Sequence, residues 1–204
     1  MQQTNENLYV IQIDNKQGCI NEQGNVVIEP KFEGISCFYN NIAVVKLNNK
    51  WGFINKKGEL VIEPVFDEAW PFSDEGLAAV KVKEKWGFIN LRGEVVIIPQ
   101  FDEVLGFVEG IASVNIDNKW GYIDKTGYLI TEIEFDQAGS FWGELARVKV
   151  NGKTGFINKA GSIVFEPQFD SANSFDDEGI ALVEVDGKYG YIKKDGSWLW
   201  KPTK

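Results

Sequence analysis

Short apolar segments separated by polar turns follow one another along the chain. Between residues 77 and 82 apolar and polar positions alternate, which is typical of a β-strand. A polar turn leads to a second apolar segment, and a turn with a glycine leads to a third. The pattern predicts a three-stranded antiparallel meander with strands at 77–82, 86–90 and 94–98, the last ended by Pro99.

The third segment is apolar at consecutive positions, both at 95–98 and in the corresponding stretch 26–28. Such a strand is typical of a sheet that is buried on both faces. We therefore expect it to be sandwiched between neighbouring copies of the meander. Residues 100–110 fit either a short fourth strand or a packed connector, and no window has the period of a long helix.

The motif Gly-aromatic-Ile recurs every 34 or 35 residues, with Cys19 in place of the aromatic residue in the first copy. A second glycine follows six positions later, and a proline follows twelve positions later except in the fourth copy, which has Ile133. A period in this range predicts units that stack on one another or are arranged radially. The first glycines of the motif are Gly18, Gly52, Gly87, Gly121, Gly155 and Gly190.

The stretch 50–64 reads Lys-Trp-Gly-Phe-Ile-Asn-Lys-Lys-Gly-Glu-Leu-Val-Ile-Glu-Pro and resembles the bacterial family of WG-repeat proteins. The resemblance extends from about Leu8 to Pro202. It is specific for the repeat and implies little about function, because such repeats occur in proteins of varied roles. We expect one repeat domain over residues 1–204, with copies at about 8–30, 31–64, 65–99, 100–133, 134–167 and 168–202.

The tryptophan that gives the family its name is not present in every copy. Trp51, Trp86 and Trp120 precede the motif glycine, whereas three other copies have a different residue there. We interpret the tryptophans as packing residues that can be exchanged. The replacements are Gln17, Thr154 and Tyr189.

The predicted fold class is all-β, with six repeats of a three- to four-stranded antiparallel meander. Six copies, strands with small residues such as Ala78 and Ala112, and termini that fall at one seam favour a propeller-like ring. An open or curled β-repeat stack is the alternative. It is supported by atypical first and last copies, which have Gln17 and the segment 198–200 where other copies have the repeated residues.

The charge of the chain limits the kinds of partner. The 204 residues have a net charge of −9, which disfavours nucleic acid and anionic membranes because both are bound through clustered Lys and Arg. A neutral or basic protein partner is expected, and the oligomeric state stays open. The first residues resemble no secretory signal and no segment is long enough to span a membrane, so we expect a cytoplasmic protein with Cys19 and Cys37 as free thiols.

The sequence offers little for catalysis. It contains no histidine, its two cysteines lack metal-site spacing, and its glycines fall in turns of the repeat, so we expect no enzyme, metal or cofactor. Five acidic residues follow a repeated phenylalanine and could act as a catalytic pair. We expect them instead to accept hydrogen bonds from nearby backbone amides: Glu33, Asp67, Asp102, Asp136 and Asp170.

Candidate binding residues lie in the loops where the copies differ, at 68–75, 139–144 and 174–178. Trp70 and Trp142 lie outside the repeated positions and are candidate anchors for a partner, although they could also fill gaps between copies. The acidic candidates are Asp74, Glu75, Glu144, Asp176, Asp177 and Glu178.

These features predict a non-catalytic protein-binding module, such as an adaptor or an acidic immunity-type inhibitor of a basic toxin. A carbohydrate or small-ligand binder is the alternative, because the repeated aromatic residues could stack on sugar rings in several equivalent pockets. A carboxylate-dependent enzyme is disfavoured.

Overall fold

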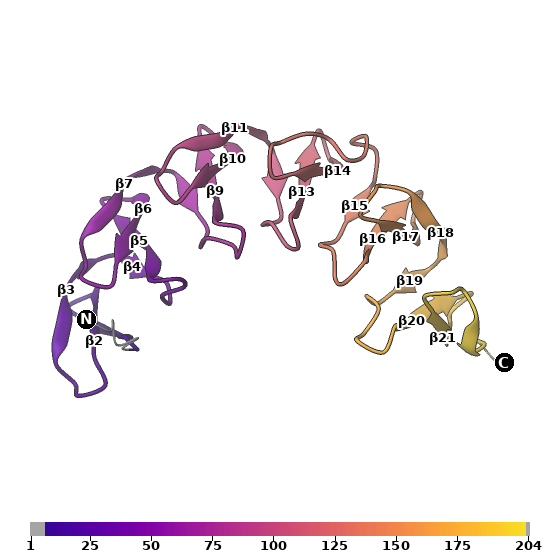
Figure 1. Ribbon diagram of the computed structural model, residues 1–204, viewed down its shortest axis with the longest axis horizontal. Helices are drawn as coiled ribbons and strands as arrows, with labels where there is room; N and C mark the ends of the chain where they lie inside the picture. The colour runs from indigo at the N-terminus through magenta and orange to yellow at the C-terminus, as the bar shows by residue number, and fades with distance from the viewer. Residues whose placement is uncertain (1–6, 203–204) are drawn as a thin grey trace. The chain divides into compact units, whose positions relative to one another are not determined.

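The computed structural model describes residues 7–202, which contain β-strands and turns and no helix. The strands form six antiparallel sheets, one for each copy (Figure 1). The chain divides into two compact halves, Met1–Gln100 and Phe101–Lys204. The predicted all-β meander repeat is therefore confirmed.

The first half has the sheet orders β1-β2-β3, β4-β5-β6-β7 and β11-β10-β9-β8. The strands are β1 Tyr9–Ile13, β2 Lys16–Ile20, β3 Val26–Phe32, β4 Gly34–Ile35, β5 Ile42–Leu47, β6 Lys50–Asn55, β7 Leu60–Phe66, β8 Glu68–Ala69, β9 Leu77–Val82, β10 Lys85–Asn90 and β11 Val95–Phe101.

The second half has the orders β12-β13-β14, β15-β16-β17-β18 and β19-β20-β21-β22. The strands are β12 Glu103–Val104, β13 Ile111–Ile116, β14 Lys119–Asp124, β15 Gln137–Ala138, β16 Leu145–Val150, β17 Lys153–Asn158, β18 Ile163–Phe169, β19 Ser171–Ala172, β20 Ile180–Val185, β21 Lys188–Lys193 and β22 Trp198–Trp200. The segment 100–110 thus contributes the short strand β12, in agreement with one of the two interpretations.

The motif glycine is required by a close approach of the backbone. A Cβ atom built on Gly52 would lie 2.6 Å from the carbonyl oxygen of Ile62 and 2.7 Å from the nitrogen of Pro64. At this point the register between β6 and β7 shifts, as in a β-bulge. Proline fits the bulge because it has no N–H group for the ladder. The glycine and the proline twelve positions later are therefore two sides of one contact.

The prediction that the third strand ends at Pro99 is wrong. β11 continues through Pro99 to Phe101, because the proline lies against Gly87 in the same close contact. The prediction that this strand is sandwiched is also wrong. Ile98 is 65% exposed, and Val95 and Val96 are exposed as well. β11 is the terminal strand of its sheet, and only Ile97 and Phe101 point into the core.

Within each half, the cores of the protein lie between successive sheets. In the first half, Phe53 of the second copy packs against Phe72 of the third, with ring centroids 4.8 Å apart. The second glycine of some copies adds a contact: a Cβ atom on Gly58 would lie 3.1 Å from Ile28, and one on Gly93 would lie 3.2 Å from Ile62. Neighbouring copies within one half therefore bury apolar side chains against each other, as expected for a repeat.

The fourth copy lacks the regular terminal strand. Its sheet has three strands, and the segment after β14 forms no regular strand but joins β14 through isolated bridges, of Ile123 with Leu129 and of Trp120 with Phe135, and through backbone hydrogen bonds such as that from the Ile130 amide to the Tyr122 carbonyl at 2.8 Å. Ile133 occupies the position of the repeated proline in this copy. The irregular structure therefore coincides with the one copy in which the proline is replaced.

The last copy exposes positions that other copies bury. Tyr191 on β21 is 44% exposed, whereas Phe156, the equivalent residue on β17, is 1% exposed. Phe156 is covered by Phe175 of the following copy, with ring centroids 4.9 Å apart. In the last copy this face is exposed at Tyr191, together with Tyr189 and Trp200.

Candidate binding surface

The repeated acidic residues hold the hairpin turns of their own copies. The Asp136 carboxylate accepts a hydrogen bond from the Asn151 amide at 2.7 Å and from the Lys119 ammonium group at 2.6 Å. Asp67 accepts from the Lys83 amide and from Lys50 in the same way. The expected structural role is therefore confirmed, and Glu33, Asp102 and Asp170 also accept from turn amides.

These contacts lower the pKa of the acidic groups. The hydrogen bond from Lys119, together with the Asn151 amide, lowers the pKa of Asp136 below its usual value. For Asp67 and Asp170 the main cause is likewise the hydrogen bond from the paired lysine. A lowered pKa in the folded state means that folding favours the ionised carboxylate.

We expect acid to weaken the protein through these groups. Their contribution is fully present above the unfolded pKa of about 3.9 and is lost as the pH falls through the lower folded pKa. Asp136→Asn should therefore reduce the difference in urea unfolding midpoint between about pH 5 and about pH 2.5. A variant with the same pH dependence as the wild type would contradict this role of Asp136.

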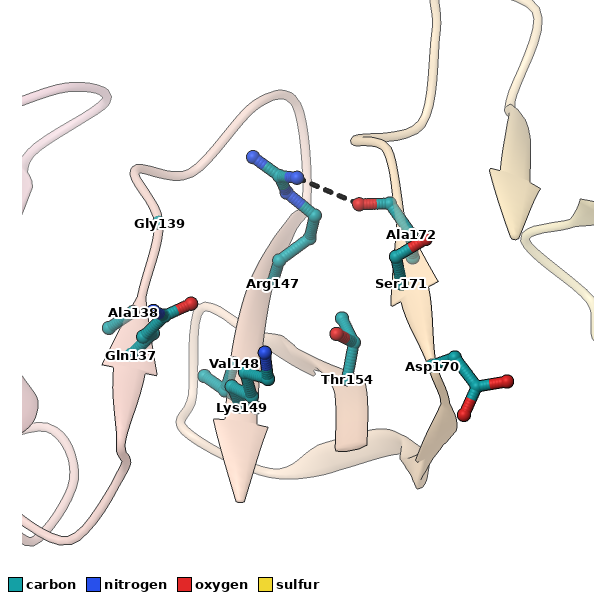
Figure 2. A pocket seen from close by; sticks show the side chains of 10 residues that line it. All are labelled: Gln137, Ala138, Gly139, Arg147, Val148, Lys149, Thr154, Asp170, Ser171 and Ala172. Carbon is teal, nitrogen blue, oxygen red and sulfur yellow. Dashed lines mark hydrogen bonds between the residues drawn. The ribbon is translucent and has the colours of Figure 1, made fainter. Parts of the chain in front are cut away.

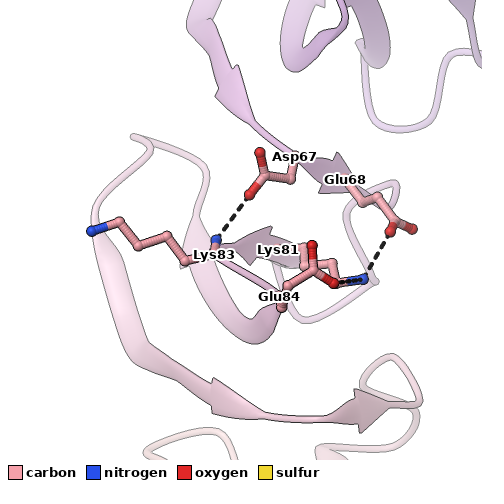
Figure 3. Close-up of polar contacts among 5 residues, drawn as sticks. All are labelled: Asp67, Glu68, Lys81, Lys83 and Glu84. Carbon is pink, nitrogen blue, oxygen red and sulfur yellow. Dashed lines mark hydrogen bonds and ion pairs between the residues drawn. The ribbon is translucent and has the colours of Figure 1, made fainter.

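In the first half, the structure places Trp70 partly over the core. Its ring lies against Trp86, with centroids 5.3 Å apart, and it is 37% exposed. The ammonium group of Lys81 lies 5.8 Å from the centroid of the Trp86 ring. The same group forms ion pairs with Glu68 and Glu84 (Figure 3). Trp70 therefore packs against another ring of the repeat and is also partly exposed to solvent.

The acidic loop of the first half is tied to its neighbour. Asp74 is exposed and accepts a hydrogen bond from the hydroxyl of Tyr39 in the preceding copy. Glu75 is half-buried in the same turn, which Gly76 closes with a φ of 73°.

Three loops of the second half form a continuous surface, which we call the rim surface: 108–110, 142–144 and 176–179. The Glu109 carboxylate accepts a hydrogen bond from the Gly143 amide at 3.0 Å, which joins the first loop to the second. The Lys194 amide donates to the Gly179 carbonyl at 3.2 Å, and its side chain reaches Gly143, where a Cβ atom would lie 3.8 Å from its nitrogen. Lys194 thus links the second loop to the third.

The rim surface brings together the candidate residues of the second half. Trp142 is 60% exposed, and Glu144, Asp177 and Glu178 are exposed in the second and third loops. Asp176 has a structural role, because its carboxylate accepts a hydrogen bond from the Ile180 amide at 2.8 Å and closes the turn.

A pocket of about 280 Å³ lies between the fifth and sixth copies (Figure 2). We call it the Thr154 pocket, because Thr154 occupies the position at which other copies have tryptophan. Arg147 crosses its upper part and donates to the Ala172 carbonyl at 2.7 Å. This pocket was not predicted from the sequence. A signal for it was present, because Arg147 is charged whereas the equivalent residues of the third and fourth copies, Ala79 and Ser113, are small and uncharged.

The titratable side chains that could hold a metal ion or react as thiols are dispersed over the described residues. No group of three or more His, Cys, Asp or Glu residues within 7–202 could hold a metal ion. Cys19 is buried, which raises its pKa, and Cys37 is exposed, and both are free thiols as expected. Over the same range, no helix has the length and apolar character needed to cross a membrane.

Solved structures with a similar fold are β-propeller-like. A eukaryotic initiation factor shares 13% identity and a TM-score of 0.59, over 95% of this chain and 62% of the other. Hsv2 of Kluyveromyces lactis shares 10% identity and a TM-score of 0.54, over 91% of this chain and 70% of the other. The chain thus spans about three fifths of the initiation factor structure, and the likeness concerns the fold alone.

The sequence itself was compared with known families and proteins. No curated protein matches it. The model of the WG containing repeat matches five consecutive segments: residues 18–51, 51–86, 86–120, 120–153 and 155–189. Each match begins at a motif glycine or at the residue before it, so the matched segments have the same period as the sheets of the structure. The chain therefore belongs to the family of proteins built from WG-containing repeats.

Proposed function

We propose that this chain is a non-catalytic protein-binding module that uses the rim surface of its second half. The observation that carries the proposal is Trp142, a large aromatic side chain that is 60% exposed among acidic loops. Exposed tryptophan is costly in water and is a frequent anchor in protein interfaces. Glu144, Asp177 and Glu178 are exposed acidic residues of the same rim surface.

The charge of the rim surface favours a neutral or basic partner. Lys159 pairs with Glu109 at 2.8 Å, so one acid is neutralised within the surface, while Asp177 and Glu178 project from the third loop. Complementary charge speeds association and selects among partners. The narrower proposal is an immunity-type inhibitor that covers a basic surface of a toxin, and an adaptor is the broader one.

The test begins with capture of the tagged chain's partner from its host lysate and continues with titration of the purified partner. The variant Trp142→Ala/Asp177→Lys/Glu178→Lys should weaken binding by about tenfold or more and reduce the dependence of the affinity on salt. The matched control is Tyr128→Ala/Glu63→Lys/Glu166→Lys, which removes one exposed ring and reverses two exposed charges elsewhere.

The control should bind as the wild type does. If the rim variant also kept its affinity and salt dependence, the partner would bind elsewhere and the proposal would be wrong.

A carbohydrate ligand is the second candidate, in a changed form. The equivalent aromatic residues of the inner copies, such as Phe53 and Phe156, are buried, so several equivalent sugar sites are not available. The last sheet alone leaves Tyr189, Tyr191 and Trp200 exposed on one face. This alternative therefore predicts one saturable site for a glycan, and Tyr191→Ala should remove it.

A further inference from the structure

We propose that the Thr154 pocket binds a small ligand through a carboxylate or phosphate group. This site is separate from the rim surface, and the inference does not rest on the proposed protein partner. The pocket is lined by residues of β15, β16, β17 and β19 and by the adjoining Gly139 and Asp170, all within the second half, and its charged side chains are Arg147, Lys149 and Asp170.

In this pocket the fifth copy has Thr154 at the position where the second, third and fourth copies have a tryptophan ring. In the second and third copies a tryptophan ring occupies this position, and a lysine of the neighbouring strand lies over the ring. In the second copy the Lys46 ammonium group is 5.7 Å from the centroid of the Trp51 ring. In the fifth copy the paired residues are Lys149 and Thr154. The lysine is retained while the ring beneath it is replaced by a small hydroxyl side chain. Space and a cation are therefore left together.

The same copy adds a second cation at the next position on this face. Arg147 lies two residues before Lys149 on β16, so both side chains leave the strand on one side. The hydrogen bond of its Nη1 group to the Ala172 carbonyl fixes the guanidinium across the gap to the sixth copy. The Nε and Nη2 groups remain as donors with the planar geometry that suits a carboxylate or a phosphate.

The acidic residues near the pocket are engaged by other groups. Asp170 lines the pocket, but its carboxylate binds Lys153 at 2.5 Å and accepts a hydrogen bond from the Gly187 amide. Glu184 accepts a hydrogen bond from the Ser171 hydroxyl at 2.7 Å. Arg147 and Lys149 therefore give the pocket an excess of positive charge within a chain whose net charge is −9.

The equivalent pocket between the fourth and fifth copies provides an internal comparison. It is lined by Glu103, Asn115, Trp120 and Asp136, so the ring is present and the two cations are absent. Asp136 is held by Lys119 there. The same fold thus offers an aromatic, acidic pocket of about 490 Å³ in one place and a smaller, basic pocket of about 280 Å³ one repeat later, and this difference in lining points to a specific use of the second.

The test is titration of the purified chain with succinate and, separately, with inorganic phosphate, followed by NMR of the arginine Nε–H signals. The wild type should show a saturable shift of the Arg147 signal with at least one probe. Comparison of the two probes shows whether the site prefers a carboxylate or a phosphate.

Two variants copy residues from other repeats. Arg147→Ser places the residue of the fourth copy in the pocket, and Thr154→Trp restores the ring while Arg147 is kept. Both should weaken binding by about tenfold or more, read from the amide signals of Lys149 and Ser171. Arg92→Ser, which removes the other arginine of the chain, should bind as the wild type does. Absence of a saturable shift with both probes, or unchanged affinity in Arg147→Ser, would overturn the proposal.

Discussion

Replacing Phe156 by alanine should lower the free energy of unfolding by about 3–5 kcal/mol. The ring is buried and lies between Phe165 and Phe175, with centroid distances of 5.6 and 4.9 Å. Its removal leaves a cavity between the fifth and sixth copies. The equivalent change in the last copy, Tyr191→Ala, should cost only about 1 kcal/mol, because that ring is already partly exposed.

Urea unfolding followed by tryptophan fluorescence measures both changes in the same protein. Because the two residues occupy the same position of the repeat, the comparison isolates the effect of a following copy. Losses of equal size would show that the open face of the last sheet is covered in solution.

A methyl group on Gly52 is the second change with a large expected effect. The Cβ atom would lie within 2.8 Å of three backbone atoms of Ile62 and Pro64, and backbone cannot move aside as a side chain can. Gly52→Ala should therefore cost about 3 kcal/mol or more in the free energy of unfolding. Gly34→Ala is the control, because its Cβ atom would meet side chains at 3.8 Å, and a loss below about 1 kcal/mol is expected.

Equal stability of the two glycine variants in urea unfolding would mean that the bulge opposite Gly52 yields easily. In that case the recurrence of glycine at this position of the motif would need an explanation other than the close approach of the backbone.

Much of the fold could be predicted from the sequence because the repeat supplies six readings of one pattern. The strand at 77–82 and the turn after it are confirmed, since Lys83 and Glu84 have the positive φ values of a tight hairpin turn, 49° and 66°. The continuation of β11 through Pro99 was missed. A proline normally ends a strand, and only the bulge against Gly87 allows the strand to pass it.

The exposure of the third strand was missed for a related reason. A run of valine and isoleucine is the usual signal for burial on both faces, but Ile98 lies in the terminal strand and stays in solvent. The closed ring, the cytoplasmic location and the protein partner stay predictions.

The candidate site was partly accessible from the sequence. Trp142, Asp177 and Glu178 were chosen as candidate partner-binding residues because their loops differ between copies; the structure exposes all three, and their role in binding stays a prediction. The loops 142–144 and 176–179 are linked by Lys194, which belongs to a different turn. No spacing of residues in the sequence predicts that contact. The Thr154 pocket was missed because a departure from the repeat was treated as tolerated variation.

The bulge at the repeated proline also affects how the molecules behave at high concentration. Each terminal strand is a sheet edge, and an uninterrupted edge can pair with the edge of another molecule and start aggregation. Pro64 removes one donor from the middle of β7, and Glu63 places a charge beside it. β11 keeps its proline but has Ile98 in place of that glutamate. Among the terminal strands that contain the repeated proline, which are β3, β7, β11 and β18, β11 therefore has the least protected edge, and pairing between molecules through these edges would start there.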